Sequence, residues 1–246
     1  MASWTGMHET IVAVADSAVR ILSPWKLDLS RYYETAESSE LSIILQDADS
    51  YSAVFEPPYR ELRCSTPGNL EQLARQLALY LGCFHSERYQ AVHGCGLVAD
   101  GAGILFSGNS GSGKSLMREL HPRAQVLDDD ILMLDTLGGR MLVTGKRGTV
   151  TDEVETARIL VEPRSPLREA TLDLVVLLDS ALPSGHLERR EAIPRSYAKL
   201  DALPDVLQSA YCALPDIEST VPVHLLGTKG KRRELLAEAV RSLMSR

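Results

Sequence analysis

Short apolar runs, alternating with polar positions, predict that the chain begins with β-structure. Three such runs stand at residues 10–14, 41–45 and 51–55. Each has the length and the period of a β-strand. Pro57 and Pro58 are expected to end this series, because proline lacks the N–H group that strand pairing needs. Residues 31–40, which place polar side chains around two tyrosines, are expected to form a solvent-facing connection.

A helical period follows the β-rich beginning. Leu70, Leu73, Leu77 and Leu81 recur at helical spacing, and Asn69 before them is a residue type that caps helix N-termini. The pattern predicts a helix of roughly 15 to 18 residues. We expect residues 1–88 to form a small β-rich N-terminal region that ends in this linking helix. Residues 89–246 are expected to form the main domain.

The main domain mixes strands with helices. Residues 91–106 predict two strands joined at Asp100-Gly101, a dipeptide typical of tight hairpin turns. Later apolar runs predict strands at 125–127, 131–134, 141–144, 172–178 and 221–226, with helices at 115–121 and 231–244. These elements predict an α/β protein.

Composition narrows the classes of function. The chain has 246 residues, of which 44% are hydrophobic and 24% charged, as in ordinary globular domains. Its net charge of -7 argues against a nucleic-acid partner held by general phosphate attraction. No apolar run reaches the roughly 18 residues of a membrane helix, so no membrane partner is expected. The absence of a signal-peptide pattern and of paired cysteines favours a cytoplasmic location.

One segment carries the clearest chemistry. Residues 108–115 match the phosphate-binding pattern G-x-x-x-x-G-K-[ST], with a predicted strand before them and a helix after. Glycines let the backbone turn its N–H groups toward phosphate oxygens, and the helix N-terminus favours the bound anion. The lysine adds a positive charge and the final serine can ligate Mg²⁺. The predicted nucleotide-binding residues are Gly108, Asn109, Ser110, Gly111, Ser112, Gly113, Lys114 and Ser115.

Three aspartates follow the strand at 125–127. Asp128, Asp129 and Asp130 stand between two apolar runs shortly after the phosphate loop, where a metal ligand or a general base is expected. A solvated turn is the alternative for such a run. Basic side chains in residues 145–170, Arg168 among them, are mostly expected at the surface, although any of them can reach a phosphate.

Taken together, these residues resemble the catalytic core of HPr serine kinase/phosphorylase, whose fold is shared with ATP-dependent phosphoenolpyruvate carboxykinase. The resemblance rests on His93-Gly94, the glycines that precede the loop, the loop itself and Asp129-Asp130. It spans about residues 91–135, and the interval from His93 to Gly108 is similar to that in those kinases. Ordinary phosphate-loop proteins do not place a histidine before a hairpin that feeds the loop.

The resemblance implies an α+β fold with a mixed sheet, in the form of a phosphoenolpyruvate carboxykinase-like core in residues 89–246, with ATP and Mg²⁺ as cofactors. Lys114 would hold the β and γ phosphates and Ser115 would ligate Mg²⁺. One of Asp129 and Asp130 would act as general base while the other contacts metal, and His93 would sit beside the transferring phosphate. Arg168 resembles an arginine that these kinases place near the active site. Homo-oligomers are also implied.

The chain departs from true HPr kinases in two respects. It lacks the glycine-rich segment that follows the aspartates, for which residues 145–148 are at best a remnant, and its N-terminal region is shorter. The resemblance therefore implies a related kinase that phosphorylates a serine-type hydroxyl of a protein, a precursor peptide or a small molecule. Alternatives are carboxykinase-type chemistry and a nucleotide-dependent binding or regulatory module with weak ATPase activity.

Overall fold

The computed structural model describes residues 6–30, 33–50, 52–67, 70–109, 111–128, 131–135, 140–143, 169–190 and 221–244. The chain divides into two compact units. Of the described residues, the first unit holds those up to Gln90 and the second holds those from Ala91 onward. We describe each unit by itself.

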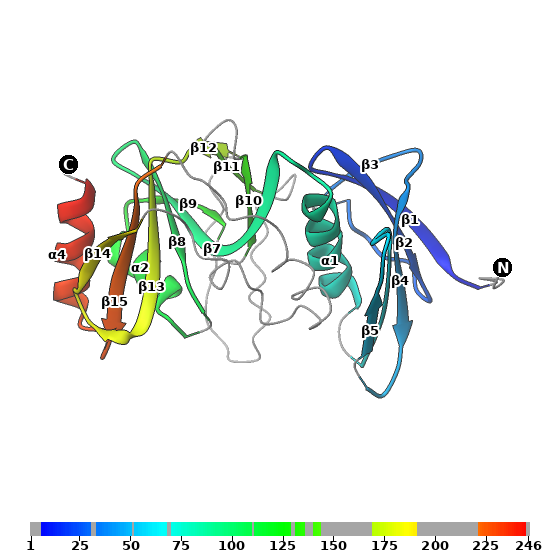
Figure 1. Cartoon of the computed structure of the whole chain (residues 1–246). Helices are drawn as coiled ribbons and strands as arrows, with labels where there is room; N and C mark the ends of the chain where they lie inside the picture. The colour runs from blue at the N-terminus through cyan, green and yellow to red at the C-terminus, as the bar shows by residue number, and fades with distance from the viewer. Residues whose placement is uncertain are drawn as a thin grey trace. The chain divides into compact units, whose positions relative to one another are not determined.

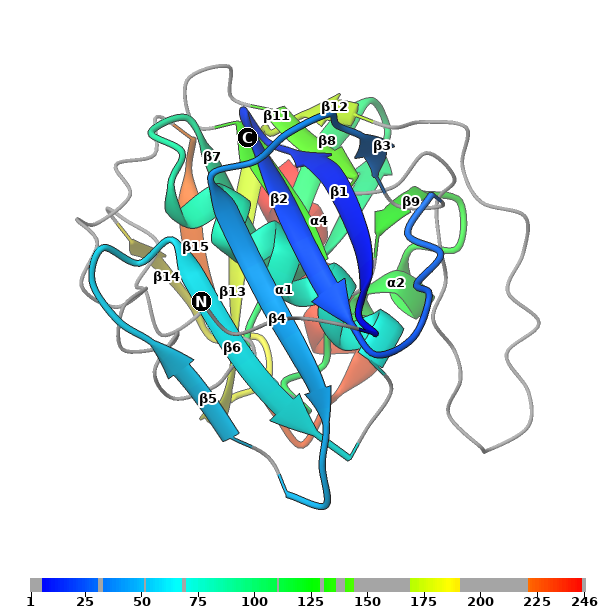
Figure 2. The ribbon, with the colours of Figure 1, turned by 90° about the vertical axis from the view of Figure 1, so that its right-hand side faces the viewer.

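The first unit is built on one mixed sheet. Its described elements are β1 (His8–Val14), β2 (Ser17–Ser23), β3 (Glu34–Thr35), β4 (Leu41–Asp47), β5 (Ser52–Phe55), β6 (Glu61–Thr66) and α1 (Leu70–Phe84). The strand order is β3-β1-β2-β4-β6-β5, in which β2, β4 and β6 run parallel. Figure 2 looks onto this sheet, with α1 behind it.

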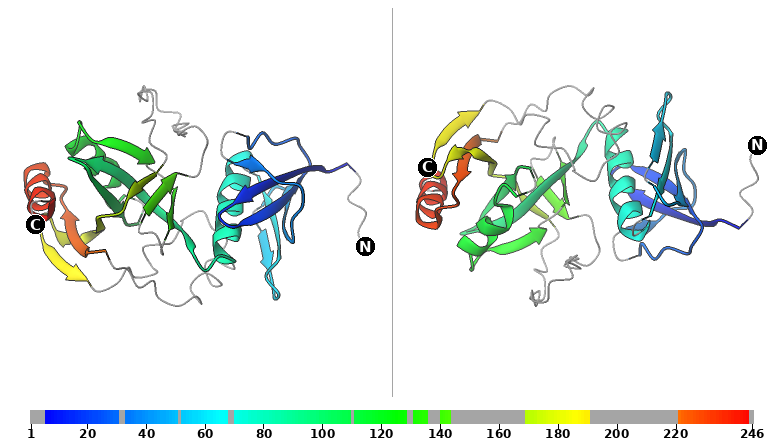
Figure 3. Two further views of the ribbon diagram at one scale, coloured as in Figure 1. Left: turned by 90° about the horizontal axis from the view of Figure 1, so that it is seen from above. Right: turned by 90° about the horizontal axis from the view of Figure 1, so that it is seen from below.

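Helix α1 packs on one face of that sheet (Figure 3). Leu77 and Leu81, which carry the helical period in the sequence, are fully buried. The strands show the matching alternation: in β6, Leu62 and Cys64 are buried whereas Arg63 between them is exposed. The predicted helix is confirmed at Leu70–Phe84, although its expected cap, Asn69, lies outside the described residues.

Two expectations about the first unit were wrong. The β-structure continues past the prolines into β6, because Pro57-Pro58 lies in the turn that joins β5 to β6, and these two strands pair antiparallel. Residues 33–40 are only partly solvent-facing. Tyr33 is buried and its hydroxyl donates to the Arg75 carbonyl of α1 at 2.6 Å, so a connection rich in polar residues still contributes a core side chain.

The second unit contains a larger mixed sheet (Figure 1). Its described elements are β7 (Tyr89–Ala99), β8 (Ala102–Ser107), α2 (Lys114–Leu120), β9 (Gln125–Asp128), β10 (Ile131–Asp135), β11 (Arg140–Val143), β12 (Glu169–Thr171), β13 (Leu174–Pro183), β14 (Leu187–Arg190), β15 (Val223–Lys229) and α4 (Arg233–Met244). The order is β12-β11-β10-β7-β8-β13-β15-β14, and β9 also pairs with β7.

Strands β8, β13 and β15 lie side by side and run parallel at the centre of this sheet. The hairpin of β7 and β8 turns at Asp100 and Gly101, whose φ angles of 51° and 85° are both positive. A two-residue turn of this kind matches the natural twist of the strands. The hairpin predicted from the sequence is therefore confirmed, and it delivers β8 to the middle of the sheet.

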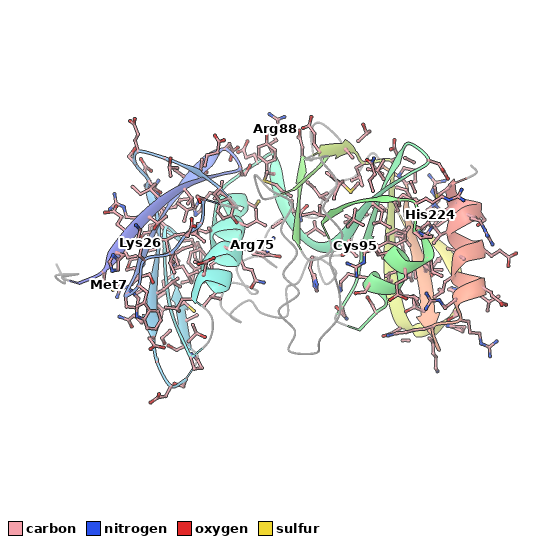
Figure 4. The ribbon with its side chains drawn as sticks, turned by 180° about the vertical axis from the view of Figure 1, so that it is seen from behind. Met7, Lys26, Arg75, Arg88, Cys95 and His224 are labelled. Carbon is pink, nitrogen blue, oxygen red and sulfur yellow. The ribbon has the colours of Figure 1, made fainter. Side chains whose placement is uncertain are left out.

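Apolar side chains cover both faces of the second sheet. On one face, Met117 of α2 and Val240 of α4 pack with Phe106 of β8 and Leu178 of β13. Figure 4 labels Cys95, which joins this cluster from β7. The opposite face buries a second cluster, which includes Leu105, Val175, Leu177, Leu132 and Met141. An ion pair of 2.9 Å between Arg233 and Glu119 also links α4 to α2.

The prediction of a mixed α+β fold is confirmed at this level, with two mixed sheets and few helices in the described residues. No described helix has the length and the apolar character needed to cross a membrane. The pairing of β14 with β15 was not predicted, because β14 is short and half of its residues are charged arginines.

Candidate phosphate-binding site

The predicted phosphate loop connects β8, which ends at Ser107, to α2, which begins at Lys114. Gly111 and Gly113 have φ angles of 75° and 110°. Both angles lie in the left-handed region, which glycine adopts without the steric cost that a Cβ atom brings. These two glycines let the backbone reverse within the loop and enter the helix at Lys114. The N-terminus of α2 consequently faces the loop.

Lys114 is folded back into the loop. Its Nζ atom donates to the carbonyl oxygens of Gly108 at 2.7 Å and Asn109 at 3.1 Å, and the residue is only 9% exposed. Both bonds hold the ammonium group at the start of the loop. A buried positive charge is favourable only with oxygen partners, and a phosphate group supplies such oxygens. The loop therefore presents a positioned cation.

Gly108 is closely surrounded. A Cβ atom at this position would lie 2.6 Å from Ser112 Oγ and 2.7 Å from the carbonyl oxygen of Leu178, so only glycine fits. The loop is also held from within and from the neighbouring strand β15: the Ser112 amide donates to the Asn109 carbonyl at 3.0 Å, and Thr228 Oγ1 donates to the Ser112 carbonyl at 2.7 Å. The loop is thus held by a hydrogen bond of its own backbone and by one from strand β15.

The Ser112 hydroxyl is buried, and it has no hydrogen-bond partner among the described residues. Buried hydroxyl groups without a partner are uncommon, since losing the hydrogen bond to water costs free energy. Within this loop, a ligand oxygen would satisfy the group. The glycine backbone, the Lys114 ammonium and this hydroxyl together fit an anionic phosphate.

His93 lies on β7, next to the strand that feeds the loop. Its carbonyl accepts a hydrogen bond from Ser107 Oγ at 2.8 Å, and its neighbour Gly94 pairs directly with Ser107. The residue is half-buried. The two-residue period of a strand places His93 on the same face as Cys95, the face that α2 covers. The hairpin thus brings His93 to the strand end from which the loop starts.

Strand β9, which leads into the three aspartates, pairs with β7, the strand that carries His93. Asp128 of β9 pairs with Gly96 of β7, and β10 resumes beside β7 at Ile131. Four predicted site residues lie outside the described residues: Ser110, Asp129, Asp130 and Arg168. Ser115 is described, and is exposed in the first turn of α2. In the described part of the chain, no group of three or more potential metal-ligating side chains gathers.

Two residues at this site were not predicted from the sequence. Thr228 lies one residue before the carboxyl end of β15, and Asp179 lies within β13, two residues beyond the last pair that β13 forms with β8. Asp179 carries a readable signal, because it ends a run of five apolar residues at 174–178. Thr228 carries no such signal, since only the parallel pairing of β13 with β15 brings it to the loop.

No protein-family model matches the sequence, and the search among curated proteins finds no significant match. Among solved structures, the Hpr(Ser) kinase/phosphatase from Coxiella burnetii is similar to this chain, with 17% sequence identity and a TM-score of 0.35. The match covers 63% of this chain and 97% of that protein's chain. A likeness at this TM-score is too distant to assign a fold or an activity.

Proposed function

We propose that the chain is an ATP- and Mg²⁺-dependent kinase that transfers the γ-phosphate to a serine-type hydroxyl of a protein, a precursor peptide or a small molecule. The observation that carries the proposal is the loop between β8 and α2, in which Lys114 is held at the carbonyls of Gly108 and Asn109. A loop already arranged for phosphate needs little reorganisation when the nucleotide binds.

The roles that we propose for the site residues follow from their positions in the loop and beside it. The loop amides and Lys114 bind the β and γ phosphates, and the Ser115 hydroxyl takes Mg²⁺. When bound, Mg²⁺ neutralises charge that develops on the phosphate oxygens during transfer. His93 is proposed to stand beside the transferring phosphate, because its carbonyl accepts a hydrogen bond from Ser107, the last residue of β8 before the loop. Its side chain would donate a hydrogen bond to a phosphate oxygen.

In the proposed reaction, the acceptor hydroxyl oxygen forms a bond to the γ-phosphorus while the bond from that phosphorus to the bridging oxygen of ADP breaks. The hydroxyl proton passes to a carboxylate, for which Asp129 and Asp130 are proposed. Arg168 is proposed to contact the phosphate or the substrate. Phosphoryl transfer relies chiefly on positioning and charge neutralisation, so this small set of groups is sufficient.

We also propose that the second unit is related to the HPr kinase and phosphoenolpyruvate carboxykinase group. The support is the sequence pattern, in which a histidine precedes the hairpin, the hairpin feeds the loop, and two aspartates follow. Two mixed sheets and the hairpin β7–β8 are compatible with that relationship. The identity of the acceptor is left open by this proposal, with HPr as one of the acceptors to be tested.

The proposal is tested by intact-mass spectrometry of acceptors after incubation with the full chain and Mg-ATP. The panel contains HPr, free serine and serine-containing peptides, and wild type is compared with Asp129→Asn and Asp130→Asn. We expect one acceptor to gain a single phosphate group with wild type, and to gain it much more slowly with at least one variant. Both variants should still bind ATP, because neither changes the loop.

A matched control is Asp173→Asn, since Asp173 lies at the opposite end of β13 from the loop. This variant should phosphorylate the same acceptor at the wild-type rate. Phosphorylation that survives both aspartate variants would overturn the assignment of the base. A chain that binds Mg-ATP but modifies no acceptor would contradict the kinase proposal.

A separate observation, a pocket in the first unit, favours a second candidate function. The first unit contains an open pocket of about 430 Å³ whose lining includes serine, histidine and charged side chains. Ser17, Ser39 and His85 contribute to it, together with the ion pair of Arg60 and Glu40 at 2.9 Å. This pocket favours a nucleotide-dependent binding module, in which the first unit recognises a polar partner. Such a module would bind ATP, hydrolyse it slowly and phosphorylate no acceptor.

A further inference from the structure

Thr228 contacts the phosphate loop from β15, a strand that is separated from β8 by β13. Its Oγ1 atom donates to the Ser112 carbonyl at 2.7 Å across 116 residues of sequence, and both residues are only 1% exposed. Leu226, two residues earlier, packs in the apolar cluster that α2 covers, so the two-residue period of β15 directs Thr228 to the same face. The contact is therefore built into the strand and is not made by a loose surface side chain.

This hydrogen bond fixes the orientation of one peptide group of the loop. The peptide group between Ser112 and Gly113 is planar and trans, so its carbonyl and its N–H point in opposite directions. Because Thr228 holds the carbonyl toward β15, the Gly113 N–H points away from β15. Gly113 immediately precedes Lys114, the cation of the loop.

A glycine-rich backbone does not hold such an orientation by itself. Gly111 and Gly113 have φ angles of 75° and 110°, and glycine adopts several backbone conformations at similar free energy. A rotation of the peptide group after Ser112 would exchange the directions of its carbonyl and its N–H. A carbonyl oxygen turned toward a phosphate repels it, whereas an N–H donates a hydrogen bond to it. The loop therefore needs a partner outside itself to hold that carbonyl.

We propose that Thr228 is a positioning residue of the nucleotide site: by holding the Ser112 carbonyl, it keeps the Gly113 N–H directed at a phosphate group of ATP. The inference rests on the proposed function, because it requires a nucleotide at the loop. Thr228 itself touches no phosphate and acts only through the peptide group that it orients. A donor that is oriented before binding raises affinity, because binding then adds no cost for ordering it.

The alternative is that the bond only stabilises the fold, as a link between β15 and the loop. In that case Thr228→Val should lower thermal stability and leave nucleotide affinity unchanged. Valine has nearly the shape of threonine but lacks the hydroxyl donor, whereas serine keeps the hydroxyl and lacks the methyl group. A positioning role follows the hydroxyl, so Thr228→Ser should retain the affinity that Thr228→Val loses.

The first measurement is the dissociation constant of a non-hydrolysable ATP analogue with Mg²⁺, for the full chain. Thr228→Val should weaken binding about tenfold, whereas Thr228→Ser should stay within about threefold of wild type. Ser184→Ala is the matched control. The Ser184 hydroxyl also donates to a backbone carbonyl, at 2.8 Å, but its acceptor is Lys229 at the end of β15 and not the loop. This variant should stay within about twofold of wild type.

NMR spectroscopy reads the proposed hydrogen bond directly. Serine labelled with carbon-13 at its carbonyl, combined with nitrogen-15 glycine, reports only the Ser-Gly pairs of the chain, whose glycines are Gly108, Gly111, Gly113 and Gly185. Ser112→Ala removes the Gly113 signal and thereby assigns it. In wild type, the nucleotide should move the Gly113 amide proton downfield, because a hydrogen bond to phosphate deshields it. Gly185, whose N–H already donates to the Gly227 carbonyl, should move much less.

The outcomes distinguish this inference from the proposed function. A wild-type chain that binds the analogue without a downfield shift at Gly113 would overturn the inference alone, and this result does not depend on the folding of any Thr228 variant. Wild-type affinity in Thr228→Val would also overturn it, and so would an equal loss of affinity in Thr228→Val and Thr228→Ser. A wild-type chain that binds no nucleotide would contradict the proposed function and, with it, this inference.

Discussion

Both units place three parallel strands at the centre of a mixed sheet, but they use the ends of those strands differently. In the first unit, β2, β4 and β6 are parallel and a long helix, α1, covers their sheet. In the second unit, β8, β13 and β15 are parallel, and the chain leaves β8 through a glycine-rich loop into the short helix α2.

The two helices show the difference most clearly. Helix α1 has 15 residues and buries leucines along its length, so its packing accounts for its stability. Helix α2 has seven residues and begins with Lys114, whose side chain is bound to the loop rather than to the apolar core. A short helix held by its loop leaves backbone N–H groups at its N-terminus for a ligand. A parallel arrangement of strands is therefore not sufficient for a phosphate-binding site, because a loop of suitable conformation must also follow one of the strands.

Of the substitutions considered, removal of the Lys114 charge is expected to have the largest effect, and this effect is on nucleotide affinity in the second unit. Lys114→Ala should weaken ATP binding about 100-fold, because the ammonium is the buried cation at the phosphate position. Isothermal titration calorimetry with the full chain and Mg-ATP measures the change. Lys26→Ala, at an exposed position of the first unit, is the control and should leave the affinity unchanged. Similar effects of the two variants would mean that the loop is not the nucleotide site.

A methyl group at Gly108 is expected to have the next largest effect. Gly108→Ala places a Cβ atom against Ser112 Oγ and the Leu178 carbonyl, so the loop must move away from β13. We expect nucleotide affinity to fall about tenfold, measured with a fluorescent ATP analogue. Gly101→Ala is the control for backbone strain away from the loop: its φ of 85° disfavours alanine although the space around it is open, so it should lower stability and keep the affinity. An unaltered affinity in Gly108→Ala would show that the loop adapts freely.

The corresponding substitution in the first unit should affect stability instead. In Gly82→Ala, the new methyl group would lie 2.8 Å from Val14 Cγ1 and 3.2 Å from the Val14 carbonyl oxygen. Overpacking of roughly 1–3 kcal/mol is partly offset by the better helix propensity of alanine, leaving a net loss of about 1 kcal/mol. Urea denaturation measures this loss. Nucleotide affinity should be unchanged, and a lower affinity would show that the two units are coupled.

The smallest expected effect concerns Cys83 of α1. Burial raises the pKa of its thiol above the usual range, and the negative charge of Asp16 raises it further. The unfolded chain therefore releases this proton at a lower pH than the folded chain does. The contribution of Cys83 to stability is complete below the ordinary thiol pKa of about 8.5 and decreases as pH rises above it.

We expect this contribution to fall by about 0.7 kcal/mol between pH 8 and pH 9. Denaturation curves at both values, for wild type and Cys83→Ala, measure it as a difference in pH dependence. Cys83→Ala changes the absolute stability as well, and only the change with pH is diagnostic. An identical pH dependence in both proteins would show that the thiol ionises in the folded chain as readily as in the unfolded one.

The sequence by itself determined the elements that depend on local periods and on special residues. The leucine spacing of α1, the Asp100-Gly101 turn and the order of strand, loop and helix around Lys114 were all readable, because each depends on neighbours within a few residues. Local patterns also led to the expected roles of Ser115, Asp129 and Asp130, whereas the role of His93 came from the family resemblance. All of these roles remain predictions.

Tertiary structure decided what the strands bring together. The parallel pairing of β8 with β13, and of β13 with β15, places the Leu178 carbonyl and Thr228 beside a loop that lies about 70 and more than 100 residues earlier in the chain. Tyr33 is buried through a similar long-range contact with α1. No local period encodes such pairings, because they depend on which strands become neighbours and in which register. The phosphate loop could therefore be predicted from the sequence, whereas the residues that surround it could be identified only from the tertiary structure.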